Sequence, residues 1–219
     1  MQMAKFYQGV QDGRWEVMTL GDSGRWFKKT FPMTPATAVT CMDDLQKQGR
    51  QTFWYDCKNY RVSFYTDRGR VCIRDMFLFD ERHDERYWNT VATGNTGVYD
   101  TLPLVDGYRW SGNDTFCAIE WVDAKGQALP GQIESVGHES DSVLTATLTA
   151  GQKKIQVHCD EEGITLSNLP DGVCLRMTYD TTADTKIEAV HPDRVEYIHD
   201  GCRYSLRVEG GTAAAAEHG

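Results

Sequence analysis

The heptapeptide Cys202-Arg-Tyr-Ser-Leu-Arg-Val208 alternates strictly between apolar and polar side chains, with the apolar ones at even positions. Successive side chains of a β-strand point to opposite faces, so this period of two predicts a strand with one buried face. Residues 144–148 and 173–179 repeat the alternation. These segments favour β structure over helix.

Turn signals separate the alternating segments, and most of them pair an Asp or Ala with a nearby Gly that tolerates a positive φ. They are Asp67-Arg-Gly69, Asp123-Ala-Lys-Gly126, Ala150-Gly151, Asp160-Glu-Glu-Gly163, Asp171-Gly172 and Asp200-Gly201. About fourteen strands at a spacing of roughly 8–12 residues are typical of a sandwich or barrel. We expect an all-β fold with very little helix. It is either one large, jelly-roll-like β-sandwich or two packed sandwich modules.

Helix is expected at one short segment only, Met42–Gln48, where Thr40 is the predicted N-cap and Gly49 the stop signal. The segment Leu20–Arg25 is instead expected to be a hairpin turn that joins strands at residues 15–20 and 25–31.

Charge and aromatic content divide the 219-residue chain near residue 112. Residues 1–110 carry 15 basic and 14 acidic side chains and 19 of the 24 aromatic ones, whereas residues 111–219 carry 8 basic and 18 acidic side chains. The division predicts an aromatic- and Arg-rich module at 1–111, an acidic, Thr-rich module at 112–210 and a tail at 211–219, although one continuous domain also fits. Ligand recognition is expected in the first module.

The composition also limits which classes of binding partner and cofactor are expected. The net charge of −9 argues against nucleic acid, which needs a basic surface. No run of about 18 apolar residues predicts a membrane span, and the first residues do not resemble an export signal. The seven cysteines are an odd number without metal-binding spacing, which predicts free thiols, no metal site and a cytoplasmic protein. No nucleotide-binding glycine loop occurs, and no cofactor is expected.

The stretch from Asp80 to Trp110 combines carboxylates, guanidinium groups and aromatic rings. Sugars need this combination, because their C–H faces stack on aromatic rings while their hydroxyl groups pair with planar donors and acceptors. A solvated rim of ion pairs explains the same residues. The predicted ligand-binding residues are Arg82, His83, Asp84, Arg86, Tyr87, Trp88, Tyr99, Asp100, Tyr108, Arg109 and Trp110.

Three short segments carry a resemblance to a known family: Tyr60-Arg-Val-Ser-Phe-Tyr-Thr-Asp67, Arg70-Val-Cys-Ile-Arg74 and Thr93-Gly-Asn-Thr-Gly-Val-Tyr-Asp100. Residues 50–110 resemble the β-sandwich domain that precedes the catalytic domain of some bacterial SGNH (GDSL-type) carbohydrate esterases. The resemblance implies an association with carbohydrate. Residues 115–219 do not look like the α/β catalytic domain that would follow.

Catalytic motifs of the same esterases have partial counterparts. Gly21-Asp-Ser-Gly24 resembles the nucleophile block, Gly112-Asn-Asp114 part of the oxyanion block, and Glu188-Ala-Val-His-Pro192 the final block. The resemblance implies Ser23 as nucleophile, Asn113 as oxyanion donor and His191 as base. The long crossover helices of a doubly wound sheet are missing from the sequence pattern, so we expect none of the three to be catalytic.

Together these features predict a carbohydrate-associated β-sandwich that binds a glycan, or helps to process one, through residues 80–110. If it is an enzyme, it is a hydrolase that acts on carbohydrate. The alternatives are an esterase that uses Ser23 and His191, a calycin-like barrel for a small apolar ligand, and a structural subunit. The expected partners are a glycan or another small polar ligand, and further a second copy of the chain or a catalytic partner chain.

Overall fold

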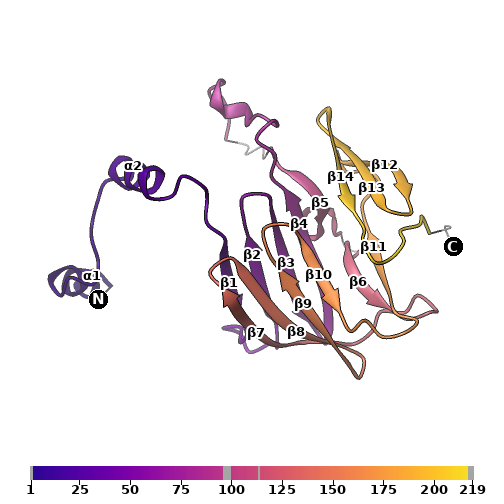
Figure 1. The fold of residues 1–219 in the computed structure, drawn as a ribbon. Coiled ribbons are helices and arrows are strands. Elements are labelled where there is room, and N and C mark those ends of the chain that lie inside the picture. Colours follow the sequence, from indigo (N-terminus) through magenta and orange to yellow (C-terminus); the bar gives the residue numbers. More distant parts are fainter. Residues whose placement is uncertain (1, 96–99, 113, 217–219) are drawn as a thin grey trace. The chain divides into compact units, whose positions relative to one another are not determined.

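The computed structural model describes residues 2–95, 100–112 and 114–216 (Figure 1). Strands make up 43 % of the chain and helices 13 %, and the paired strands of the described residues are antiparallel, which confirms the predicted all-β class. The contacts divide the chain into two compact units, Met1–Pro35 and Ala36–Gly219. The first unit contains helices α1 (Gln2–Gln11) and α2 (Leu20–Thr30).

The second unit contains three sheets. The large sheet runs in the order β1-β2-β3-β4-β6-β11, and β5 also pairs with β4. Its strands are β1 (Thr37–Cys41), β2 (Gln51–Asp56), β3 (Tyr60–Asp67), β4 (Arg70–Leu78), β5 (Leu102–Asp106), β6 (Ala118–Val122) and β11 (Cys174–Thr178). The four-stranded sheet runs β10-β9-β8-β7, with β7 (Ile133–Ser140), β8 (Val143–Ala150), β9 (Lys153–Cys159) and β10 (Ile164–Ser167). The three-stranded sheet comprises β12 (Lys186–His191), β13 (Arg194–His199) and β14 (Cys202–Arg207).

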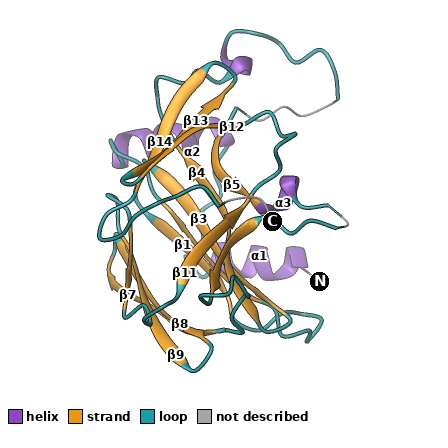
Figure 2. Ribbon diagram, turned by 90° about the vertical axis from the view of Figure 1, so that its right-hand side faces the viewer, coloured by secondary structure: helices purple, strands orange, loops and turns teal. Residues whose placement is uncertain are grey.

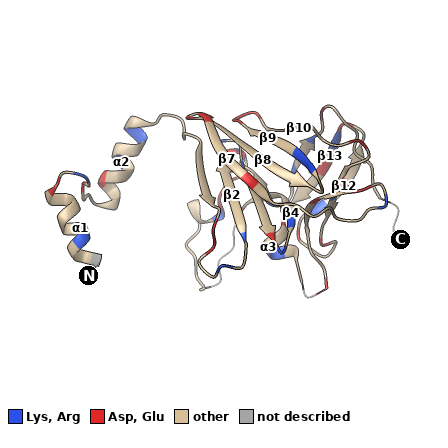
Figure 3. Ribbon diagram, turned by 90° about the horizontal axis from the view of Figure 1, so that it is seen from below, with Lys and Arg blue, Asp and Glu red and all other residues tan. Residues whose placement is uncertain are grey.

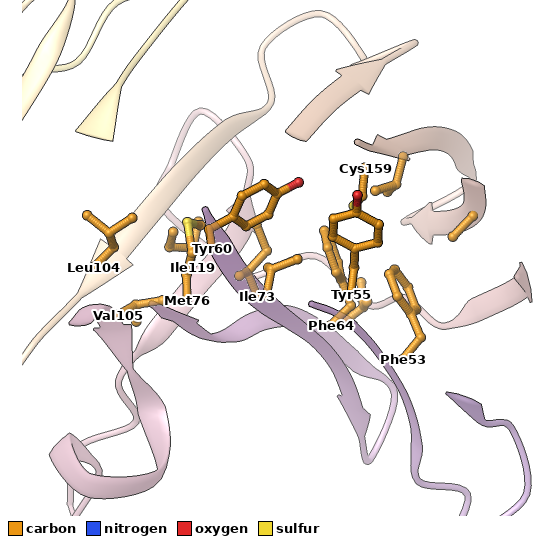
Figure 4. Close-up of a cluster of buried hydrophobic side chains, with 14 of the residues drawn as sticks. Phe53, Tyr55, Tyr60, Phe64, Ile73, Met76, Leu104, Val105, Ile119 and Cys159 are labelled. Carbon is orange, nitrogen blue, oxygen red and sulfur yellow. The ribbon is translucent and has the colours of Figure 1, made fainter. Parts of the chain in front are cut away.

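The four-stranded sheet packs over one face of the large sheet (Figures 1 and 2). Alternate residues of β2 and β3 point into the space between them, including Phe53 and Phe64, whose rings stack 4.5 Å apart. Figure 4 shows this cluster, which includes Tyr55 and Tyr60. The Tyr55 hydroxyl donates to the Ser142 carbonyl at 2.7 Å. The core therefore forms from period-two alternation in both sheets.

The three-stranded sheet is attached to the large sheet through β5. The hydroxyl of Tyr204 donates to the Pro103 carbonyl at 2.7 Å, and its ring stacks on Tyr197 at 5.4 Å. The large sheet takes strands from both sides of residue 112, because β6 pairs with β4. The predicted division near that residue stays a prediction. Residues 211–216, the described part of the predicted tail, contain no helix or strand.

The prediction of a hairpin turn at Leu20–Arg25 is wrong, because this segment forms the beginning of helix α2. The Thr19 side chain accepts a hydrogen bond from the Asp22 backbone N–H at 3.1 Å and caps the helix. Asp22 also lies in the first turn, where its charge suits the helix N-terminus. These signals outweigh the low helix propensity of Gly21 and Gly24.

The prediction of a helix at Met42–Gln48 is also wrong, since this stretch has an irregular backbone. The Asp44 carboxylate accepts hydrogen bonds from the backbone N–H groups of Gln46, Gln48 and Arg50, at 2.8 to 3.2 Å. An Asp side chain that bonds to nearby backbone competes with the helical pattern. Lys47 has a φ of 55°, which no right-handed helix accommodates.

Candidate functional site

Residues 79–101 connect β4 to β5 and contain most of the predicted ligand-binding side chains; we call them the β4–β5 segment. Their charges form pairs with each other. Arg82 pairs with Asp80 at 2.5 Å, and this bond lowers the pKa of Asp80 to about 2. Arg86 pairs with Asp100 at 2.5 Å and with Asp200, in the turn between β13 and β14, at 3.2 Å. Hydrogen bonding to Arg86 lowers the pKa of Asp100.

The aromatic residues of this predicted site have different environments. Trp88, in the 3-10 helix η1 (Arg86–Trp88), is 83 % exposed, whereas Tyr87 is less exposed. Trp110 is only 8 % exposed and lies in the hydrophobic core, with its ring centre 6.4 Å from that of Tyr179. Trp110 therefore has the surroundings of a core residue, while Trp88 is open to solvent.

The remaining predicted residues that the structure describes differ in their surroundings. Asp84 is exposed, and the Nε2 atom of His83 is buried with no hydrogen-bond partner among the described residues. Arg109 lies 3.7 Å from Asp106. Tyr99 and Asn113 lie outside the described residues.

A second concentration of polar and aromatic side chains lies on the face of the large sheet that points away from the four-stranded sheet. We call it the outer face and define it by Trp54, Arg61, Ser63, Tyr65 and Arg74. Trp54 on β2 pairs in register with Ser63 on β3, and Ser63 pairs with Asp75 on β4. A bulge in β4 next to this pair includes Arg74. Across the second unit as a whole, basic and acidic positions are interspersed (Figure 3).

The two guanidinium groups of the outer face lie next to aromatic rings. The central carbon of Arg61 is 4.4 Å from the ring centre of Phe77 and 5.6 Å from that of Trp54. That of Arg74 is 4.8 Å from Tyr65 and 6.0 Å from Trp54. Direct carbon contact occurs at about 3.5–4.0 Å, so neither guanidinium packs directly on the middle of the indole. The outer face thus alternates cations and rings, an arrangement stabilised by cation–π attraction.

Two carboxylates beneath this surface have structural partners. Asp75 accepts from Arg74 Nε at 2.6 Å and from the backbone N–H of Tyr108 at 3.3 Å. Asp106 accepts from the backbone N–H of Arg109 at 3.0 Å and caps helix α3 (Gly107–Trp110). Together they hold α3 beside β4 and place the backbone of Tyr108, whose side chain is 80 % exposed, next to Asp75.

Gly107 explains why α3 lies so close to β4. A Cβ atom at this position would lie 2.6 Å from the Arg74 carbonyl oxygen, so only glycine fits without a shift of the backbone. Of the predicted site residues, Tyr108 thus has its backbone N–H on Asp75, which pairs in register with Ser63 of the outer face.

Two polar atoms of the outer face lack partners. Ser63 is completely buried, and its hydroxyl has no hydrogen-bond partner among the described residues; the same holds for Nε of Arg61. Both residues lie on β3, two positions apart, and so share one face. Buried polar groups without partners are uncommon and call for an explanation such as a ligand or ordered water.

Sequence analysis missed Trp54, Arg61, Tyr65 and Arg74 as site residues. The signal was present, because the alternation in residues 60–67 places Arg61, Ser63 and Tyr65 on one face while the core residues take the other. The surroundings of Arg61 depend on strands that are distant in the sequence, and the alternation does not reveal them.

Of the three residues named by the esterase alternative, the structure describes Ser23, in the first compact unit, and His191, in the second. The Ser23 hydroxyl donates to the Leu20 carbonyl within α2 at 2.9 Å. His191 lies in β12, 3.5 Å from Glu196, whereas Glu188, the first residue of the segment that resembles the final esterase block, pairs with Arg203. Asn113 is not described, and the esterase alternative stays a prediction.

Two further observations concern metals and membranes. Within the described ranges, no three His, Cys, Asp or Glu side chains are grouped as a metal ion requires. Among the helices described, none has the length and apolar character needed to cross a bilayer.

All seven cysteines lie in the described part of the chain, and each is a free thiol.

Comparisons with family models, with curated proteins and with solved structures found no match to this chain. The functional assignment therefore depends on the geometry of the candidate sites.

Proposed function

We propose that this chain is a carbohydrate-binding β-sandwich that holds a glycan on the outer face of its large sheet. One observation carries the proposal: the guanidinium groups of Arg61 and Arg74 lie 5.6 Å and 6.0 Å from the ring centre of the half-buried Trp54, so cationic donors and an aromatic ring occur together on this face. A sugar ring needs an apolar surface for its C–H face and planar donors for its hydroxyl groups. The outer face offers both.

The β4–β5 segment supports this function less well. Arg82 and Arg86 already form short ion pairs with Asp80 and Asp100. A ligand hydroxyl would have to compete with these charge-assisted bonds, which are stronger than neutral ones. On the outer face, Arg74 is paired with Asp75 at 2.6 Å, but Arg61 makes no such bond to a described residue, so a ligand can bind Arg61 without displacing a carboxylate.

Tyr108 extends the proposed surface. Its ring is mostly exposed, and Asp75 and Asp106 fix the short helix that carries it. A site anchored on strands and a capped turn needs little ordering when it binds a ligand, which favours affinity.

The proposal is tested by screening the full chain on a glycan array and titrating the best oligosaccharide by calorimetry. Trp54→Ala is expected to weaken binding by about 1–3 kcal/mol, roughly 5- to 150-fold, because it removes the central aromatic contact. Circular dichroism and a melting curve establish that the variant is folded. A blank array, or unchanged affinity of the folded variant, would contradict the proposal.

A further inference from the structure

Arg61 differs from the arginines around it. Arg70 pairs with Glu120 at 2.5 Å, Arg74 with Asp75 at 2.6 Å and Arg50 with Asp67 at 3.4 Å. Arg61 has no carboxylate oxygen within 4.0 Å among the residues that the structure describes, and its buried Nε donates to none of them. It is a partly buried cation without an anionic partner.

The position of Arg61 is nevertheless well defined. Phe77, at 4.4 Å, and Trp54 lie next to its guanidinium, and its Cα is paired in register with those of Asp56 and Phe77. A guanidinium stays charged at every physiological pH and carries five N–H donors in a rigid plane. The aromatic neighbours attract the charge but accept none of these donors in ordinary hydrogen bonds. The donors on its two terminal nitrogens, unlike the buried Nε, are preorganised for an acceptor that comes from outside.

The nearest carboxylates do not meet this need. Burial raises the pKa values of Asp56 and Asp106, while the charge of Arg61 acts on both in the opposite direction. Neither carboxylate is within ion-pair distance of Arg61, and Asp106 already accepts from the Arg109 backbone. The charge of Arg61 thus acts on the pKa values of Asp56 and Asp106, but its N–H groups donate no hydrogen bond to either carboxylate.

We infer that the glycan of the outer face is acidic, and that its carboxylate or sulfate group pairs with Arg61. This inference rests on the proposed function. The guanidinium groups of Arg61 and Arg74 lie 5.6 Å and 6.0 Å from the ring centre of Trp54, so an acidic sugar that contacts this indole has a cation beside it. A carboxylate accepts two parallel N–H bonds from one guanidinium, an arrangement that neutral hydroxyl groups cannot match in strength.

The test compares two ligands that differ only in charge: tetragalacturonate and its fully methyl-esterified form. Calorimetric titration of the full chain at low salt should give at least about tenfold tighter binding for the acid. The preference should shrink as ionic strength rises from about 0.05 to 0.5 M, since salt screens the pair. A sulfated tetrasaccharide forms a third arm, and tight binding of this arm alone identifies sulfate as the anion.

Arg61→Met keeps most of the aliphatic packing and removes the charge, so it should abolish the preference for the acid over the ester, whatever its effect on binding of the ester itself. Arg203→Met is the matched control, because Arg203 is exposed and pairs with Glu188 in the three-stranded sheet; it should leave the preference unchanged. If Arg61→Met does not fold, Arg61→Lys keeps the charge without the planar fork and should reduce the preference.

The outcomes separate the two proposals. Equal binding of the ester and both acidic ligands overturns the acidic assignment while the glycan-binding function stands. A preference that survives in Arg61→Met also overturns it. If no acidic ligand binds and the glycan array is blank, both proposals fall.

Discussion

The β4–β5 segment and the outer face contain the same kinds of residue, but they use them differently. In the segment, Arg82 and Arg86 bind carboxylates of the chain itself. On the outer face, Arg61 lies against aromatic rings and has no carboxylate partner among the described residues. The comparison shows that the charges in a dense run of charged and aromatic residues can pair with each other, as Arg82 does with Asp80 and Arg86 with Asp100. Local sequence density does not report this property.

The largest effect is expected within the predicted site itself, between its two tryptophans. Trp110→Ala removes a core side chain and should lower the free energy of unfolding by about 3–5 kcal/mol. Trp88→Ala truncates a side chain that is 83 % exposed and should change it by less than about 0.5 kcal/mol. Urea unfolding measures both. Equal losses in the two variants would show that the environments of these residues are not as described.

Acid should act on the β4–β5 segment through Asp100. Hydrogen bonding to Arg86 lowers its pKa in the folded state. The resulting stabilisation is fully present above the unfolded pKa of about 3.9 and is lost as the pH falls through the lower folded value. Asp100→Asn should therefore flatten the fall of stability between about pH 5 and pH 2, measured by urea unfolding at each pH. A variant as acid-sensitive as the wild type would contradict this role of the Arg86 pair.

Asp56 on the large sheet should change the pH dependence of stability in the opposite direction to Asp100, and by a smaller amount. Burial raises its pKa, so ionisation costs stability as the pH rises from the unfolded value of about 3.9 through the folded one. Asp56→Asn removes this cost and should gain stability relative to the wild type as the pH rises from about 4 to 7. The same unfolding series detects it. A relative gain toward low pH would reverse the sign and show that Asp56 is stabilised as a carboxylate.

Much of the fold follows from local patterns in the sequence. Alternation predicted the strands, and the turn signals Asp67-Arg-Gly69 and Asp200-Gly201 lie where the chain needs positive φ. Arg68 and Gly69 have φ values of 52° and 75°, and Asp200 and Gly201 have 47° and 77°. Two consecutive positive φ values suit the twist of tight hairpins. Such features need only neighbouring residues and are therefore visible in the sequence.

The errors came from competing local interactions and from distant contacts. At residues 42–48, the Asp44 side chain bonds to backbone N–H groups that a helix would have used. In the candidate site, Arg61 and Arg74 are 13 positions apart, and whether each finds a carboxylate depends on the register of three strands and a bulge. Composition placed ligand recognition in the first half of the chain, but it did not distinguish the β4–β5 segment from the outer face.

The central claim is that the outer face, and not the β4–β5 segment, binds the glycan. It is tested most directly by measuring the Kd of one oligosaccharide for Trp54→Ala and Trp88→Ala side by side, with both variants shown to be folded. The account predicts weakening of roughly 5- to 150-fold for Trp54→Ala and no more than about twofold for Trp88→Ala. Loss of binding in Trp88→Ala with unchanged binding in Trp54→Ala would contradict it and assign the site to the β4–β5 segment.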